Sequence, residues 1–283
     1  MNPIRKLLSA TTAVLLLAVA VRADDIAEAG RRIYEKNQDA VVTIKAVIKV
    51  SGSGGGMSIN QQEQRVETTG TIVDPSGLTL TSYTIMNPAN AIRSNIKRMM
   101  TQRGMPPTDV DINSEVASAK IILSDGTEIN AEVVLRDEDL DVAFLRPTEK
   151  PAKPFPCVSL ADNPTVQLFD PVVTLNRLGN IAKRTLAMSS GRIEARVQKP
   201  RLFYSVSAAI TGSPLGGPVF TLDGKLIGLI LVRKSVGDDA ESGLGGNPSG
   251  LLPVLTPVSE LGDSIKQALT ATPKKEEKKA KEK

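Results

Sequence analysis

The sequence predicts an all-β protein made of two β-barrels, with a short helix before and after them. Short segments rich in β-branched residues are separated by turn signals roughly every eight to twelve residues, which is typical of barrels and sandwiches. Residues 147–156 contain four prolines and lie between two halves of similar texture. This proline-rich linker favours two barrels of similar size, over residues 40–147 and 157–255.

Residues 1–23 are predicted to be a secretory signal peptide. Arg5 and Lys6 precede an uncharged apolar run over residues 7–21, and small residues follow where a signal peptidase would cut. The run is shorter than the roughly 20 apolar residues that a membrane-spanning helix needs. We therefore expect an exported protein, periplasmic or secreted, with no stable membrane span after cleavage.

The first half is predicted to begin with a helical segment over residues 24–39, because Ile26, Ala29 and Ile33 can share one helix face. Residues 51–56 are rich in glycine and serine and are expected to form a loop that packs against nothing. Residues 87–118 are expected to be a mobile surface insertion, with a basic amphipathic helix over residues 91–103. Strands are predicted at residues 40–50, 65–73, 78–82, 119–123, 128–135 and 142–146.

The second half repeats the strand pattern and ends in a helix. Helical spacing of Val258, Leu261, Ile265 and Leu269 predicts a C-terminal helix within residues 256–271, and residues 272–283 are predicted to be a disordered charged tail. Strands are predicted at residues 171–175, 186–197, 202–207, 217–221, 225–232 and 250–255.

Composition excludes several kinds of chemistry. The chain has no histidine and a single cysteine, Cys157, so an intrachain disulfide and a cysteine–histidine nucleophile are both excluded. No cofactor-binding or metal site is expected, and the acidic run at residues 137–139 is expected to be a solvated turn. The net charge of +4 is modest and no nucleic-acid-binding module is present, so no nucleic-acid partner is expected.

Three segments, in order, resemble the HtrA/Deg family of trypsin-like serine proteases. Residues 70–86 are similar to the family's histidine segment, with Thr84 at the histidine position. Residues 125–145 are similar to the aspartate segment, with Asp141 at the acid position. Residues 208–220, Ala-Ala-Ile-Thr-Gly-Ser-Pro-Leu-Gly-Gly-Pro-Val-Phe, are similar to the nucleophile segment, with Leu215 at the serine position. The resemblance covers about residues 40–255 and implies a trypsin-like double β-barrel.

The departures from the family pattern predict a degenerate triad at Thr84, Asp141 and Leu215. A serine protease needs an imidazole that takes and returns a proton, and leucine has no atom that can attack a carbonyl. Asp141 is expected to remain as a structural carboxylate that accepts hydrogen bonds from the backbone or from Thr84. The remnant of the oxyanion loop is expected at Ser213, Pro214 and Gly216, where proline removes one backbone donor.

The resemblance therefore implies a pseudoprotease without peptidase activity. It is expected to bind a polypeptide or a protein partner through the cleft between the barrels, where an extended chain can pair with a strand edge. Two alternatives stay open: a divergent active serine endopeptidase that uses Ser213, and a structural envelope protein whose groove is filled by residues 87–118. Homo-oligomer formation also stays open.

Overall fold

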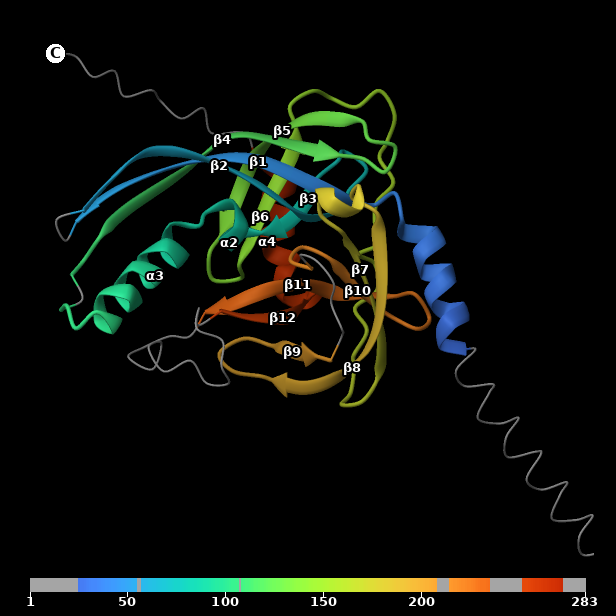
Figure 1. Cartoon of the computed structure of the whole chain (residues 1–283). Coiled ribbons are helices and arrows are strands. Elements are labelled where there is room, and N and C mark those ends of the chain that lie inside the picture. The colour runs from blue at the N-terminus through green and yellow to red at the C-terminus, as the bar shows by residue number, and fades with distance from the viewer. Residues whose placement is uncertain (1–24, 55–56, 107, 208–213, 235–250, 272–283) are drawn as a thin grey trace, which may run out of the picture.

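The computed structural model describes residues 25–54, 57–106, 108–207, 214–234 and 251–271 (Figure 1). The predicted signal peptide, the predicted charged tail and Ser213 lie outside these residues. Within them, no helix is long and apolar enough to cross a membrane.

The first barrel is closed by six antiparallel strands in the order β1-β2-β3-β6-β5-β4. Its strands are β1 (Val41–Gly54), β2 (Met57–Ile72), β3 (Thr79–Ser82), β4 (Asp111–Ile122), β5 (Glu128–Asp137) and β6 (Val142–Pro147). Two helices, α2 (Tyr83–Met86) and α3 (Ala89–Gln102), lie between β3 and β4. A helix over residues 25–37 precedes β1.

The second barrel is also closed by six strands, in the order β10-β11-β12-β9-β8-β7. Its strands are β7 (Pro171–Arg177), β8 (Leu186–Val197), β9 (Phe203–Val206), β10 (Pro218–Thr221), β11 (Leu226–Lys234) and β12 (Leu251–Pro257). A short 3-10 helix, η1 (Asn180–Ala182), lies between β7 and β8, and α4 (Val258–Thr270) follows β12. The predicted class, an all-β trypsin-like double barrel, is confirmed.

The prediction of a loop that packs against nothing is wrong for residues 51–54. They continue β1, and Gly52 pairs with Ile59 of β2 on one side and with Ile112 of β4 on the other. A Cβ atom on Gly52 would lie 2.5 Å from Ile112 Cδ1 and 2.6 Å from the Asp111 carbonyl oxygen. Glycine is needed here because the neighbouring strand approaches too closely for a side chain.

The prediction of a mobile insertion over residues 87–118 is also wrong in part. The expected basic helix is confirmed as α3, but residues 111–118 belong to β4 and pair with the far end of β1. Ala89 and Met100 of α3 are buried in one cluster with Ile48 and Ile112. Figure 1 shows α3 beneath the extended ends of β1, β2 and β4. Ala89, Met100 and Ile112 of this segment therefore belong to the first barrel's core.

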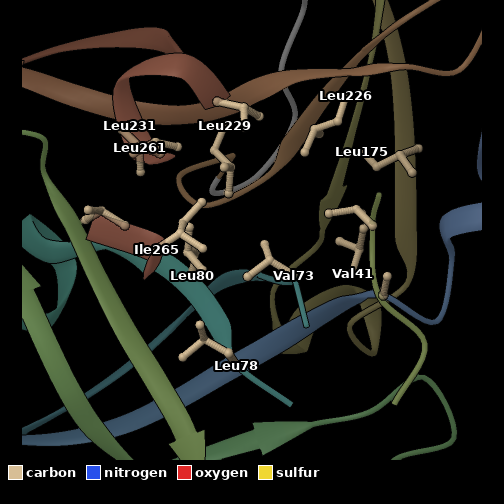
Figure 2. Close-up of a cluster of buried hydrophobic side chains, with 14 of the residues drawn as sticks. Val41, Val73, Leu78, Leu80, Leu175, Leu226, Leu229, Leu231, Leu261 and Ile265 are labelled. Carbon is tan, nitrogen blue, oxygen red and sulfur yellow. The ribbon is translucent and has the colours of Figure 1, made fainter. Parts of the chain in front are cut away.

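One apolar cluster joins the two barrels (Figure 2). It combines Leu78 and Leu80 of the first barrel with Leu175 and Leu229 of the second. Helix α4 leaves the second barrel and adds Leu261, Ile265 and Ala268 to this cluster. Arg146 of β6 donates hydrogen bonds to the carbonyl oxygens of Ala268, Leu269 and Ala271, so it caps the C-terminal end of α4. The two barrels and α4 thus share a continuous core.

Candidate functional site

Asp141 lies where the two barrels meet. It ends the turn between β5 and β6, is 2% exposed, and has a left-handed backbone conformation with φ of 57°. Aspartate adopts this conformation more readily than most residues, yet at some energetic cost. The turn thus places a carboxylate inside the protein rather than in solvent.

Three donors surround this carboxylate. Oδ2 accepts hydrogen bonds from Ser82 Oγ and from the backbone N–H of Val232, both at 2.7 Å. Oδ1 accepts one from the backbone N–H of Thr84, also at 2.7 Å. Ser82 and Thr84 flank the start of α2, whereas Val232 belongs to β11 of the second barrel. Asp141 therefore links the two barrels. It also connects β3 and α2 to the β5–β6 turn.

Burial raises the pKa of the Asp141 carboxyl above its usual value. The hydrogen bonds from Thr84, Ser82 and Val232 act in the opposite direction, because they favour the charged form. A buried carboxylate with several donors is a stable structural element when all its donors are in place. The expectation that Asp141 accepts hydrogen bonds from Thr84 and the backbone agrees with these contacts.

Leu215 is half-buried and packs against an apolar cluster of the second barrel. The buried members of that cluster are Val166, Val172, Ile193, Tyr204, Val219, Ile227, Ile230 and Leu255. Its carbonyl oxygen accepts a 2.9 Å hydrogen bond from Thr68 Oγ1 of the first barrel. The residue at this position is thus held by packing on one barrel and by a hydrogen bond from the other.

The turn that follows Leu215 is tightly constrained. Gly216 has φ of 90°, and a Cβ atom there would lie 2.2 Å from the Thr69 carbonyl oxygen. Its N–H donates to the Ile230 carbonyl and its carbonyl accepts from Thr71 Oγ1 at 2.7 Å. The Gly217 N–H donates to the carbonyl of Pro214 at 2.7 Å. These two backbone donors are therefore already used within the protein.

Buried threonines of β2 form contacts that the sequence interpretation did not include. Thr68 and Thr71 bind the turn at Leu215 and Gly216, and Thr69 Oγ1 accepts a hydrogen bond from the backbone N–H of Arg177 at 2.9 Å. The run Glu-Thr-Thr-Gly-Thr at residues 67–71 is a visible signal, because consecutive threonines in a buried strand need hydrogen-bond partners. Their partners lie more than 100 residues away in the sequence, so the run alone does not identify them.

The acidic run at residues 137–139 is largely the solvated turn that was expected, because Glu138 and Asp139 are exposed turn residues, but Asp137 is the partly buried last residue of β5. Asp137 accepts hydrogen bonds from the Leu140 N–H and from Ser264 Oγ of α4, and Glu138 accepts one from Asn90. Across the part of the chain that the structure describes, no group of three or more histidine, cysteine or acidic side chains is placed to hold a metal ion.

Two closed six-stranded barrels, joined by a buried aspartate at the end of a β5–β6 turn, define a protein of the trypsin-like double-barrel class. The chain belongs to the family of the trypsin-like peptidase domain, whose sequence model matches residues 68–229. The match runs from β2 to β11 and contains Thr84, Asp141 and Leu215.

Bacterial DegP-type proteins are similar to part of this chain. A DegP-like periplasmic serine endoprotease of Rhizobium meliloti is 30% identical over 139 residues, which are 46% of this chain and 26% of the relative. A protein of the same description from Rickettsia conorii is 27% identical over 167 residues, 56% of this chain and 27% of the relative. The periplasmic serine endoprotease DegP of Salmonella typhimurium is 28% identical over 130 residues, 45% of this chain and 27% of the relative.

The resemblance to the HtrA/Deg family is thereby confirmed. The chain spans only about a quarter of the length of these relatives.

Proposed function

We propose that this chain is an exported, catalytically inactive member of the trypsin-like family that binds a polypeptide or a protein partner where its two barrels meet. The observation that carries the proposal is the environment of Asp141. Its carboxylate accepts hydrogen bonds from Thr84, Ser82 and Val232, in a chain that contains no histidine. The acid that would orient an imidazole in a serine protease serves here to hold the barrels together.

The chemistry of the remaining positions supports inactivity. The hydroxyl of Thr84 does not titrate near neutral pH, so it cannot replace an imidazole as general base. Leu215, which the resemblance aligns with the serine, has no nucleophilic atom and packs into an apolar cluster. Loss of a nucleophile or its base lowers the rate of a serine protease by about 10⁴ to 10⁶. With both absent, no physiological peptidase activity is expected.

The scaffold around these positions supports a binding role. The contacts of Asp141 with Val232 and of Thr68 with Leu215 hold the two barrels in a defined arrangement. Recognition of an extended polypeptide relies on backbone hydrogen bonds and shallow side-chain sites rather than on a nucleophile. Loss of catalysis therefore does not require loss of binding.

The relatives support the proposed location. Those from Rhizobium meliloti, Rickettsia conorii and Salmonella typhimurium are named as periplasmic. Together with the signal-like residues 1–23, these names favour export of this chain to the periplasm or beyond.

A second candidate function is a divergent serine endopeptidase, because the same relatives are named as serine endoproteases. In this chain the nearest serine to the aligned position is Ser213, two residues before Leu215. Covalent labelling of Ser213 by a fluorophosphonate, together with cleavage of protein substrate, would establish this second function.

The binding role is tested by fluorescence anisotropy with labelled, unfolded casein. Leu215→Arg places a long charged side chain at the junction of the barrels, and we expect it to raise the Kd at least about tenfold. Leu252→Arg is the matched control, because Leu252 is a 54% exposed leucine of β12. Equal Kd values for the wild type and both variants, with unchanged thermal midpoints, would refute binding at this position.

A further inference from the structure

Arg233 carries a guanidinium with unused donors at the junction of the barrels. It lies in β11 directly after Val232, whose backbone N–H binds Asp141. Its Nη1 donates a hydrogen bond to the Asp139 carbonyl of the first barrel. The other two nitrogens, Nε and Nη2, are buried and have no acceptor among the described residues. Buried donors without an acceptor are costly and rare in folded proteins, so these two nitrogens require an explanation.

Two other arginines of the barrel junction use their donors more fully. Arg177 donates through Nε, Nη1 and Nη2 to three backbone carbonyl oxygens. Arg146 donates through both terminal nitrogens to the end of α4, and only its Nε has no partner. Of these three arginines, only Arg233 leaves the pair Nε and Nη2 unused. These two nitrogens lie on one edge of the guanidinium, where their parallel N–H groups match the two oxygens of a carboxylate.

Arg233 also lacks a direct counter-ion. Among the described residues, no aspartate or glutamate forms an ion pair with it, and the nearby Glu260 lies 3.8 Å from Arg201 instead. Burial lowers the pKa of the Arg233 guanidinium and the positive charge of Arg201 lowers it further, whereas Glu260, Asp141 and Asp137 raise it. An arginine stays protonated under all physiological conditions. The junction therefore holds a positive charge that no described carboxylate contacts.

The guanidinium is held in a fixed orientation. Its central carbon lies 5.7 Å from the centre of the Phe203 ring of β9, within the range of a cation–π contact. The hydrogen bond to the Asp139 carbonyl fixes the opposite end of the group. Arg233 as a whole is half-buried, so its side chain borders solvent. A planar donor group that is already oriented loses little freedom when it binds a carboxylate.

We infer that Arg233 binds the carboxylate of an acidic side chain in the bound polypeptide, through parallel hydrogen bonds from Nε and Nη2. The inference rests on the proposed function and names the chemistry of the partner, which is an acidic polypeptide segment. The carboxylate would supply the missing acceptors and the missing counter-ion together. Both nitrogens are covered in the free chain, so the incoming carboxylate displaces part of that cover.

The first test is nuclear magnetic resonance of the arginine Nε–H groups in the whole protein. The probe is N-acetylglutamate α-amide, whose only carboxylate is the side chain, and N-acetylglutamine amide is the matched neutral probe. The Arg233 resonance, assigned from its absence in Arg233→Lys, should shift in a saturable way with the glutamate probe only. The resonance of Arg31, an exposed arginine of the first helix, should stay unchanged. No saturable shift of the Arg233 resonance would overturn the inference.

The second test compares two forms of casein by fluorescence anisotropy. One is dephosphorylated casein, and the other is the same protein with its carboxyl groups converted to amides. The wild type should bind the unmodified form at least about tenfold more tightly. Arg233→Lys keeps the charge but loses the paired N–H groups, so its two Kd values should differ by no more than about threefold. Arg31→Lys is the matched control and should keep the wild-type preference.

The outcomes separate this inference from the proposed function. Equal Kd values of the wild type for the two caseins would overturn the role of Arg233 and leave polypeptide binding in place. Binding of neither casein would overturn the proposed function and, with it, the polypeptide as the source of the carboxylate. The resonance shift then decides by itself whether Arg233 binds a carboxylate. Thermal midpoints of both lysine variants show whether they are folded.

Discussion

The Asp141 carboxylate accepts a 2.7 Å hydrogen bond from the backbone N–H of Val232, which joins a turn of the first barrel to a strand of the second. The same oxygen accepts from Ser82 Oγ, and the other oxygen accepts from the N–H of Thr84. Both oxygens of a carboxylate that the family resemblance assigns to the triad acid are thus occupied with contacts that maintain the fold.

Replacement of Asp141 with Asn should destabilise the protein by about 1–3 kcal/mol at neutral pH. An amide offers only one acceptor oxygen, whereas both oxygens of the carboxylate accept hydrogen bonds. The NH₂ group of the asparagine would therefore face a backbone or hydroxyl donor and leave that donor without an acceptor. Urea unfolding followed by circular dichroism measures the change. Asp109→Asn is the control, because the Asp109 side chain is 98% exposed and its replacement should change stability by no more than about 0.5 kcal/mol.

The contribution of Asp141 to stability should depend on pH in a defined direction. Burial raises the pKa of its carboxyl in the folded state, so above the unfolded-chain value of about 3.9 the folded protein binds more protons than the unfolded chain. The contribution is therefore fully present below that pH and declines as the pH rises through the raised pKa.

Urea unfolding of the wild type and of Asp141→Asn at a series of pH values measures this dependence. The difference in unfolding free energy between them should be largest in acid and should decrease as the pH rises, because the variant lacks the titrating group. A difference that grows with rising pH would mean that the pKa of Asp141 is lowered by folding.

Gly216→Ala should be strongly destabilising, by about 2 kcal/mol or more. The new Cβ atom would lie 2.2 Å from the Thr69 carbonyl oxygen, at a φ of 90° that alanine rarely adopts. Gly262→Ala in α4 is the matched control, because a Cβ atom there has no neighbour within 4 Å. In a helix, that change should stabilise by about 0.5–1 kcal/mol. Thermal unfolding of both variants distinguishes close packing at Gly216 from a general effect of glycine replacement.

Arg177→Met should destabilise the protein by about 2–4 kcal/mol, because its guanidinium connects the second barrel to the start of the first. Nε donates to the Val41 carbonyl and Nη2 to the Gln38 carbonyl, both at 2.8 Å. Arg196→Met is the comparison, since Arg196 is an exposed arginine of β8. Amide hydrogen exchange at residues 38–42 should be faster in the Arg177 variant and unchanged in the Arg196 variant. Equal exchange rates in both variants would show that the guanidinium contacts are dispensable.

Much of the fold was predictable because short strands and turns leave local signals. The strand over Leu186–Val197 has the predicted bounds, and Pro200 follows its end closely as a turn signal. The far end of β1 was not predictable from composition, because Ser51 and Gly52 have low strand propensity and become a strand only between β2 and β4. Residues 111–118 show the same effect: their polar residues hide the alternation of Ile112 and Val116.

The site was predictable only as far as the family resemblance reaches. Thr84 and Asp141 lie in hydrogen-bonding contact, and their assignment to the triad positions stays a prediction. Val232, Thr68 and Thr71 could not be inferred, because each acts across the barrel junction on a residue 91 to 147 positions away. Such contacts arise from packing of the two barrels and leave no local pattern.

The most direct test of the account is turnover of unfolded casein by the purified protein, with a serine-directed fluorophosphonate as inhibitor. The wild type should show no cleavage above buffer and no covalent labelling, because the chain lacks histidine and Leu215 cannot act as a nucleophile. A Thr84→His/Leu215→Ser variant, measured in parallel, shows whether the scaffold still supports serine-protease cleavage once a histidine and a serine are introduced. Cleavage by the wild type that the fluorophosphonate abolishes would contradict the assignment as an inactive protease homologue.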